Sequence, residues 1–284
     1  MRPRLDRFLR RRLRPPRSGI PLSPGRRGEQ PEDSPSGLAE LQEWLRGKAL
    51  PALRLRVEPT DLESLSPVES HLGGPPFWPE DEPWPVCGQC DRPLTFVGQV
   101  RLDGEGAPRV GRAKLLTFHY CFHCLPCDAD EASAYRLRLY DDIDAVRQSQ
   151  RPRPDADDPD HTRWAPVPCR ITFEPVRSVP HWYDAEPELA GLDRGADPWE
   201  TYLAAARAVA PAPNVESRLG GYPDWVQRSD WPSCPECGRR MHLIWQLDSE
   251  PEARIMWGDT GRVYVFACPL SCSEHALALV MQCC

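Results

Sequence analysis

Eight of the twelve cysteines fall into four closely spaced pairs, and these pairs are the clearest candidates for chemistry in the 284-residue chain. A short gap within a pair turns both thiolates toward one side, so two pairs can supply four sulfurs to one cation. The interval between the second and third cysteine of each set is 31 positions in both sets. The sequence therefore predicts two metal centres, formed by Cys87, Cys90, Cys121 and Cys124, and by Cys234, Cys237, Cys268 and Cys272.

Zinc is the cation that this ligand set favours, because four thiolates in a tetrahedron suit Zn²⁺ at about 2.3 Å per bond. Four sulfur ligands leave no position for water, so we expect two structural ions and no catalytic one. Two other interpretations stay open: an iron–sulfur site, and disulfides, which need an oxidising compartment. Five nearby residues are alternative ligands that the spacing does not decide between: Cys127, His119, His123, Cys283 and Cys284. For the last two we favour a packed terminal strand.

Catalytic motifs are absent from the sequence. It contains no phosphate-binding Gly-rich loop with Lys, no GxSxG elbow, no HExxH helix and no GxGxxG turn. Four carboxylates gather around a predicted hairpin and could do general acid–base work, but no histidine partner is indicated. These are Asp248, Glu250, Glu252 and Asp259. The sequence predicts no catalytic residue, and we expect the protein not to be an enzyme.

The cysteine sets belong to a longer internal similarity. A shift of 147 residues places 68–121 on 215–268 without a gap, and 17 of the 54 positions are identical. Ordinary composition gives about three identities by chance. The sequence therefore predicts a duplication, with repeats at about 52–127 and 215–284 joined by a different region at 128–214. The alternative is convergent loop chemistry around two unrelated metal knuckles.

Two further features recur in each repeat. Gly73 and Gly74 match Gly220 and Gly221, and we expect tight turns with positive φ; an anion-binding nest is the alternative. Gln99 and Gln246 lie in otherwise apolar strands, where a buried amide needs partners. We expect each glutamine to bond to backbone of the Gly-Gly/Trp segment in its own repeat. The alternative is a ligand-reading pair across a pseudo-twofold axis.

Short runs of Val, Phe, Tyr and Trp bounded by Gly and Pro indicate strands, and Leu or Ala at helical spacing indicates two helices. The helices are expected at 37–50 and at 199–209, the latter capped by Asp197. The acidic stretch 154–160 is interpreted as a solvated, unstructured loop. The predicted strands are 53–57, 94–100, 114–120, 134–139, 170–175, 241–247 and 262–267.

These elements predict a β-rich α+β fold with two pseudo-symmetric antiparallel halves that share a core, each with a four-cysteine zinc knuckle pair. The region 36–284 is expected to be a single domain made of both repeats. Residues 1–35 are expected to be a disordered tail rich in Arg and Pro.

Charge is unevenly distributed along the chain. Residues 1–30 contain ten Arg and two acids, a net charge of +8, and the remainder carries −15. An acidic body is a poor nucleic-acid binder, so contact with nucleic acid is expected only through the Arg-rich tail. No apolar run approaches the length that a membrane-spanning helix needs, and no secretory signal is present. We therefore expect no membrane contact and a cytoplasmic location.

Several segments resemble known families. SRLGGYPDWVQ, LIWQLDSE and MWGDTGRVYVFA are similar to signature segments of the YwqG-like family, a bacterial domain of unknown function, and LGGPPFWP followed by RPLTFVGQVRL is similar to its opening motif. This resemblance spans roughly 52–284 and implies a fold but no catalytic residues. Typical members lack the cysteine pairs, so the knuckles are a departure.

A second resemblance covers mainly 70–124. The order LGG-x-P-x-W, CxxC, PLxFxxQV and a later cysteine pair is similar to the programmed cell death protein 2 family of eukaryotes. That resemblance implies chaperoning of a small-subunit ribosomal protein. We therefore expect a non-enzymatic, zinc-stabilised protein-binding or chaperone-like module with a basic protein partner. The alternatives are a toxin-immunity or regulatory binder, and an enzyme with a site between the two halves.

Overall fold

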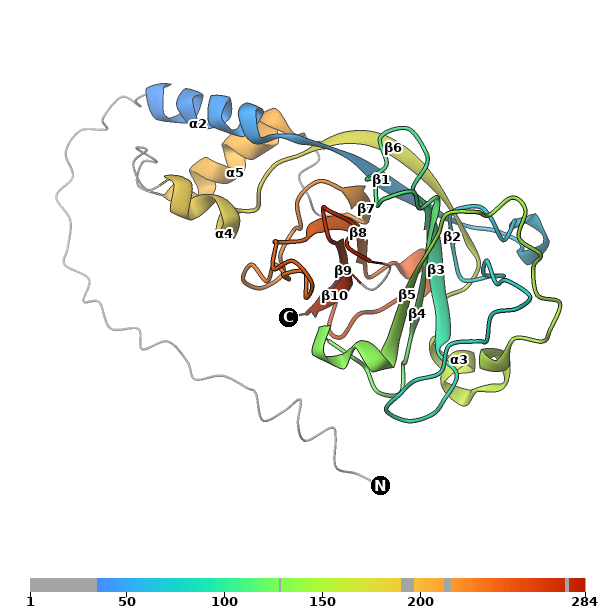
Figure 1. Ribbon diagram of the computed structural model, residues 1–284. Coiled ribbons are helices and arrows are strands. Elements are labelled where there is room, and N and C mark those ends of the chain that lie inside the picture. Colours follow the sequence, from blue (N-terminus) through green and yellow to red (C-terminus); the bar gives the residue numbers. More distant parts are fainter. Residues whose placement is uncertain (1–34, 128, 190–196, 212–215, 274–275, 284) are drawn as a thin grey trace. The chain divides into compact units, whose positions relative to one another are not determined.

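The computed structural model describes residues 35–127, 129–189, 197–211, 216–273 and 276–283. The predicted tail lies outside the described residues except for its last residue. Ten strands form one antiparallel sheet in the order β10-β9-β8-β7-β1-β6-β2-β3-β4-β5 (Figure 1). In chain order the strands are β1 (Leu50–Pro59), β2 (His71–Leu72), β3 (Thr95–Arg101), β4 (Leu115–Tyr120), β5 (Tyr135–Tyr140), β6 (Cys169–Ser178), β7 (Arg218–Gly220), β8 (His242–Asp248), β9 (Arg262–Ala267) and β10 (Leu277–Gln282).

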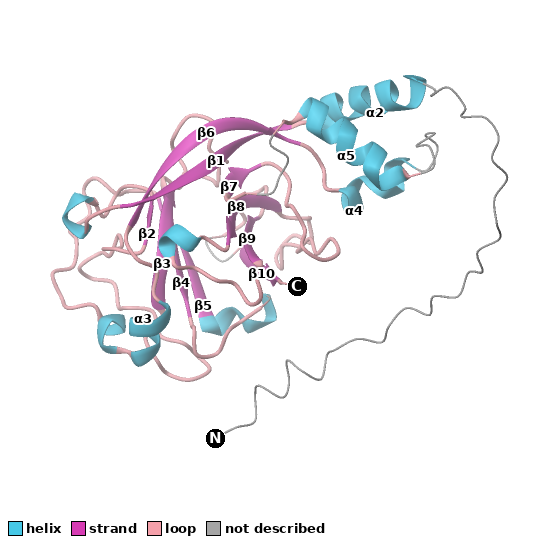
Figure 2. Ribbon diagram, turned by 180° about the vertical axis from the view of Figure 1, so that it is seen from behind, coloured by secondary structure: helices cyan, strands magenta, loops and turns pink. Residues whose placement is uncertain are grey.

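The two longest strands lie in the middle of the sheet. β1 and β6 pair over their full length, from Leu50 opposite Ser178 to Pro59 opposite Cys169. β1 then pairs with β7 on its other edge, and β6 pairs with β2. The β1–β6 ladder therefore joins two arms of four strands each: β2 to β5 on one side, and β7 to β10 on the other (Figures 1 and 2).

The two arms place matching backbone features 147 residues apart, the same offset as the identities in the sequence. β3 and β8 have the same length and begin at Thr95 and His242, and each contains a register shift, between Phe96 and Gly98 and between Leu243 and Trp245. β4 and β9 are offset by the same interval. Such irregularities bend a strand and increase its local twist. Each arm therefore bends at the same point of its second strand.

Curvature of both arms makes the sheet a nearly closed barrel. Its interior is filled by apolar side chains from both arms, and Phe118 of β4 lies 6.3 Å from Trp245 of β8, ring centre to ring centre. The ends of the sheet approach where the amide of Met281 in β10 donates to the carbonyl of Cys127, at 2.7 Å. Close packing of large aromatic rings on one shared core stabilises both arms together.

Two helices outside the sheet pack against each other. α2 (Pro35–Lys48) presents Leu41 and Leu45 to Tyr202 and Ala206 of α5 (Pro198–Val209). α5 begins at Asp197, whose carboxylate accepts hydrogen bonds from the amides of residues 199 and 200, as the sequence predicts. The other α-helices of the described residues are short: α3 (Pro159–Trp164) and α4 (Trp182–Ala185). No helix in the described part of the chain is long and apolar enough to cross a membrane.

The strand predictions are confirmed to within one residue for 94–100, 114–120, 134–139, 241–247 and 262–267. The two central strands are longer than expected, because they extend through Pro51 and Pro175, which the sequence patterns treated as boundaries. The predicted helix 37–50 ends earlier, at Lys48, and the following strand starts at Leu50.

The prediction of an unstructured loop at 154–160 is wrong. The segment forms a 3₁₀ turn (Pro154–Asp157) and then α3, and Asp155 is fully buried. The Asp155 carboxylate lies 2.7 Å from Nη2 of Arg153 and 3.1 Å from Nδ1 of His161, and it accepts from the amide of Phe96 in β3. Burial alone raises a carboxyl pKa, but His161 and Arg153 overcome it and lower the pKa of Asp155 to about 2.

Candidate metal centres

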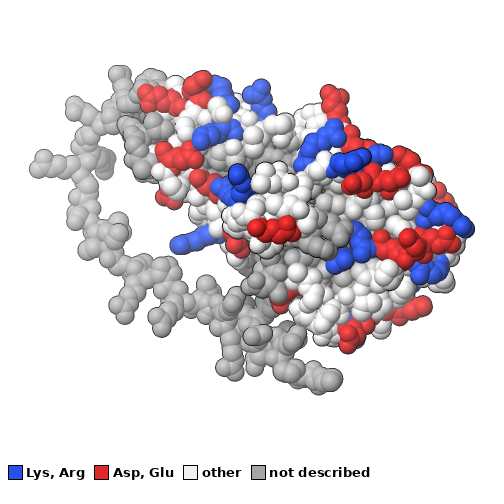
Figure 3. All heavy atoms as spheres, viewed as in Figure 1, with Lys and Arg blue, Asp and Glu red and all other residues white. Residues whose placement is uncertain are grey.

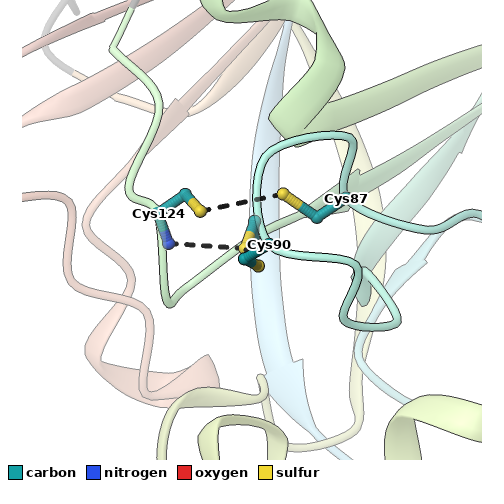
Figure 4. A group of neighbouring side chains, drawn as sticks. Cys87, Cys90 and Cys124 are labelled. Atoms are coloured by element: carbon teal, nitrogen blue, oxygen red, sulfur yellow. Dashed lines mark hydrogen bonds between the residues drawn. The ribbon is translucent and has the colours of Figure 1, made fainter.

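The first centre lies between two turns at one end of the β3–β4 hairpin. Cys87 and Cys90 sit in a turn closed by a bridge between Val86 and Pro93, and the amide of Cys87 donates to the carbonyl of Arg92. Cys121 and Cys124 lie just after β4. Figure 4 shows Cys124 on one loop with its sulfur directed at Cys87 on the facing loop, and Cys90 beside them. The sulfurs of all four residues lie within 4.8 Å of one another.

The second centre is built in the same way. Cys234 and Cys237 sit in a turn closed by a bridge between Ser233 and Arg240, and these two residues match Val86 and Pro93 in the sequence repeat. The amide of Cys234 donates to the carbonyl of Arg239 at 2.8 Å, the same distance as between the amide of Cys87 and the carbonyl of Arg92. The sulfurs of Cys234, Cys237, Cys268 and Cys272 all lie within 4.8 Å of one another.

The sulfur spacing fits one tetrahedral cation in each centre. Four bonds of about 2.3 Å at tetrahedral angles put neighbouring sulfurs about 3.8 Å apart. The sulfur separations are 3.8 Å for Cys87–Cys124 and 3.7 Å for Cys90–Cys121. In the second centre they are 3.6 Å for Cys237–Cys268 and 3.5 Å for Cys268–Cys272. Disulfide sulfurs lie about 2.05 Å apart, so these cysteines are thiols and not disulfides.

Backbone amides and crowded sulfurs set the acidity of the thiols. In the first centre the amide of Gln89 lies 3.4 Å from the sulfur of Cys87, and that of Cys124 lies 3.3 Å from the sulfur of Cys121. Burial opposes ionisation of Cys87, but amides of Gln89 and Cys90 lower its pKa. Burial and two neighbouring sulfurs raise the pKa of Cys124 to about 12. Four thiols this close cannot all ionise alone, and a bound cation would supply the missing positive charge.

The two centres differ in exposure. Cys87 and Cys121 are buried, and their partners Cys90 and Cys124 are partly buried. Cys234 and Cys268 are buried as well, but Cys237 and Cys272 are exposed. The first centre is covered by the segment at 133–134, where carbonyls of Ser133 and Ala134 accept from the amides of Gly88 and Cys121. An ion in the second centre would therefore be more accessible to solvent.

The alternative ligands lie outside both sulfur groups. Nδ1 of His123 lies 3.2 Å from a carboxylate oxygen of Asp160, and the ring of His119 packs against Trp84 and Phe96. The sulfur of Cys127 points to the carbonyl of Leu125, and Cys283 lies against Gly258 and Gly261. Cys284 lies outside the described residues. Among the described residues, each group therefore consists of cysteine sulfurs alone.

The matched glycines lie at the start of each arm. Gly73, Gly74, Gly220 and Gly221 all adopt positive φ, at 57°, 70°, 70° and 72°. A Cβ on Gly73 would lie 2.4 Å from the carbonyl oxygen of Pro166, so this position has no room for a side chain. The glycines thus permit close approach of backbone, and their role in the described structure is to shape the turns.

The matched glutamines hold these loops to the sheet. Oε1 of Gln99 accepts from the amide of Phe77, and Nε2 donates to the carbonyls of Pro67 and Glu69. Gln246 repeats the arrangement: its Oε1 accepts from the amide of Asp224, and its Nε2 donates to the carbonyl of Glu216. Both amides are fully buried. Saturated hydrogen bonding leaves neither glutamine free to read a ligand.

Three of the four carboxylates at the second hairpin line one cavity, and Asp259 lies outside it. Asp248 pairs with Arg262, with 2.8 Å between its Oδ2 and Nε, and Asp259 is exposed. Glu250 and Glu252 line a cavity at the end of β8 together with Ser217. Ser217 was missed as a site residue, although it and Ser70 are identical in the repeat alignment, and that identity was the available signal.

With this geometry established, comparison with known proteins gives the family. The model for a domain of unknown function, DUF1963, matches residues 70–271, and the chain belongs to this family. The match includes all of the candidate metal ligands except Cys272.

One curated protein is similar over part of the chain. It is an uncharacterized protein, YpfL, of Salmonella typhimurium, 32% identical over 116 residues. The aligned region covers 37% of this chain and 27% of that relative. The chain thus spans about a quarter of the relative's length, and the likeness supplies no activity.

Proposed function

We propose that each sulfur group holds one structural Zn²⁺ and that the chain is a non-enzymatic protein-binding or chaperone-like module. The observation that carries the proposal is the pair of four-cysteine groups, in each of which all sulfurs lie within 4.8 Å of one another and two pairs lie 3.5–3.8 Å apart. A set of four thiolates suits zinc or a single iron, and zinc needs no redox partner. With every coordination position filled by sulfur, the ion fixes loops and has no place for substrate.

We propose that the partner is a basic protein. The chain after residue 30 carries a net charge of −15, and an acidic surface steers a basic client toward it. On the face shown in Figure 3, acidic side chains are interspersed with basic ones, so that face offers no continuous basic surface for nucleic acid. The resemblance to the programmed cell death protein 2 family, over mainly 70–124, favours this role. We also propose a cytoplasmic location, because free thiols persist in a reducing compartment.

We propose that the two arms arose by duplication. The bridges, register shifts, glycine turns and glutamine hydrogen bonds recur at one constant offset along the chain, and this regularity supports such a history. A toxin-immunity or regulatory binder is the second candidate function and would use the same fold. An enzyme with a site between the arms is the third, and the apolar core packed between the arms argues against it.

Elemental analysis with native mass spectrometry tests the proposal. We expect two zinc ions per chain, and one after Cys87→Ser or after Cys234→Ser. Affinity capture with the loaded chain should then recover a basic protein in stoichiometric amount. A chain that carries two zinc ions yet captures no partner in any such test would contradict the binding role. Turnover of a small molecule, lost on mutation of a pocket residue, would favour the enzyme instead.

A further inference from the structure

A cavity of about 330 Å³ lies where β1, the segment before β7 and the end of β8 meet. Leu55 and Val57 of β1 contribute apolar surface, and Ser217 and Ser249 contribute hydroxyls. The remaining lining is charged, with five acidic side chains and one basic one, Arg56. The acidic residues are Glu58, Glu216, Asp248, Glu250 and Glu252.

Among the described residues, part of this negative charge has no counter-charge. Arg54 pairs with Glu216, and Arg262 pairs with Asp248. The guanidinium of Arg56 is engaged by Glu174, at 2.7 Å. Within the described part of the chain, the other three acids, Glu58, Glu250 and Glu252, form no ion pair. Glu250 accepts a hydrogen bond from the buried hydroxyl of Ser217, which brings no positive charge.

The other arm contains a guanidinium at the matching place. Ser70 accepts from the amide of Arg101 at 2.8 Å, just as Ser217 accepts from the amide of Asp248 at 2.9 Å. The guanidinium of Arg101 makes two bonds to Asp103, at 2.8 and 2.6 Å.

The guanidinium of Arg101 also donates to the carbonyl of Val68, at 3.1 Å. In the repeat alignment Asp103 matches Glu250, and Arg101 matches Asp248. The first arm thus supplies its own cation, and the second arm has a carboxylate in its place.

We propose that the cavity of the second arm binds the guanidinium of an arginine side chain presented by a partner protein. The inference rests on the proposed binding function for the source of that arginine. The planar fork of a guanidinium pairs with a carboxylate through two parallel hydrogen bonds, as Arg101 does with Asp103. Glu250 takes the place of Asp103, with Glu252 and Glu58 adding negative charge to the same cavity.

The raised pKa of Glu250 agrees with a carboxylate that has no positively charged partner among the described residues. Burial is the main reason that the pKa of Glu250 is raised to about 7. The hydrogen bond from Ser217 lowers this pKa, and the negative charges of Asp248, Glu252 and Glu216 raise it further. Arg56 and Glu58 face the same cavity from β1. A bound guanidinium favours the ionised carboxylate, so binding should strengthen as the pH rises from 6 to 8.

The test uses the zinc-loaded full chain and N-acetyl-arginine amide as the probe, followed by NMR. We expect saturable shifts in the signals of residues 248–252. Glu250→Gln should weaken probe binding at least about tenfold, because it removes a charge-assisted hydrogen bond. Asp248→Arg puts a guanidinium at the position matching Arg101 and should abolish probe binding. Asp259→Asn, exposed and outside the cavity, is the matched control and should bind normally.

Each failure has a distinct meaning. No saturable shift at 248–252, or equal affinity for N-acetyl-lysine amide, would overturn the guanidinium assignment. Retention of two zinc ions shows that a variant is folded, and Glu250→Gln keeps the test decisive if Asp248→Arg does not fold. Capture of a basic protein that is unaffected by Glu250→Gln would overturn this inference but leave the proposed function. Probe binding without capture of any protein partner would overturn the proposed function but leave this inference.

Discussion

The two arms of the sheet share a scaffold but differ in the side chains placed on it. The bridge, bulge, glycine turns and glutamine of one arm recur at the matching positions of the other. In the first arm Phe77 and Leu115 pack together, whereas the matching Asp224 and Arg262 form an ion pair. Backbone hydrogen bonding and the grouping of the cysteines therefore constrain the shared positions, and the remaining positions are free to change polarity.

The metal centres show the same contrast. Both contain four sulfurs within 4.8 Å of one another, but the outer cysteines of the second centre are exposed and those of the first are partly buried. Because the sulfur geometry is the same, we predict one metal ion in each centre. Because the second centre is more exposed, we predict that its ion exchanges faster. The following variants test how far the two arms are alike.

Loss of a buried ligand should have the largest effect. Cys121→Ser removes one of the two buried sulfurs of the first centre, and we expect unfolding to become easier by about 5 kcal/mol or more, since a structural zinc contributes on the order of 10 kcal/mol in small zinc peptides. Denaturant unfolding together with zinc content measures this. Cys127→Ser, close by but outside the sulfur group, should keep both ions and normal stability.

Each arm is also braced by an aspartate from the connecting region. Asp155 is fully buried and pairs with Arg153 and His161, which are partly exposed. Asp184 is partly exposed and accepts from the indole nitrogens of Trp225 and Trp231. Asp155→Asn leaves Arg153 without its charge partner and should cost about 3 kcal/mol at pH 7.

Asp184→Asn keeps one acceptor oxygen and should cost about 1 kcal/mol. Thermal unfolding of the two variants compares the contributions of Asp155 and Asp184 to stability. The exposed Asp157→Asn, from the same turn as Asp155, serves as the control. An equal loss for Asp155→Asn and Asp157→Asn would contradict the importance of the buried pair.

Metal release should separate the two centres kinetically. With excess chelator at neutral pH, we expect two phases of equal amplitude, with the faster about tenfold quicker. That ratio corresponds to about 1.4 kcal/mol of barrier. The fast phase should disappear in Cys272→Ala and persist in Cys124→Ala. Loss of both ions in a single phase would show that the exposure of the cysteines does not control the rate of metal release.

The smallest effect is expected at Glu250. Its pKa is raised to about 7 from an ordinary value near 4.5, so its contribution to stability is present below pH 4.5 and is lost as the pH rises through 7. Glu250→Gln should therefore match the parent protein near pH 5 and be more stable at pH 8. Unfolding at both pH values measures this, and a variant less stable than the parent at pH 8 would contradict the assignment.

Short-range patterns predicted the strands and the cysteine groups well. Cysteine spacing, the Gly-Gly turns and the runs around Gln99 and Gln246 are local signals, and each appears twice, so one copy supports the other. The terminal run was expected to pack as a strand, and β10 occupies most of it. These features are determined by neighbours in the sequence and by the chemistry of the side chains themselves.

Long-range partners could not be predicted in this way. The burial of Asp155 depends on contact with β3, whose Phe96 amide lies 59 residues away in the sequence. The pairing of β1 with both β6 and β7, and the cavity that this creates, depends on how the arms close around one core. A single sequence shows charges such as Glu58 and Glu216 but not that the fold brings them together.

X-ray absorption spectroscopy at the zinc edge tests the central claim most directly, because it reports the ligands of both ions in the intact chain. We predict four sulfur neighbours at about 2.3 Å per zinc, with no nitrogen or oxygen neighbour and no second metal nearby. A histidine or water in the shell, or a metal–metal distance typical of an iron–sulfur cluster, would contradict the account.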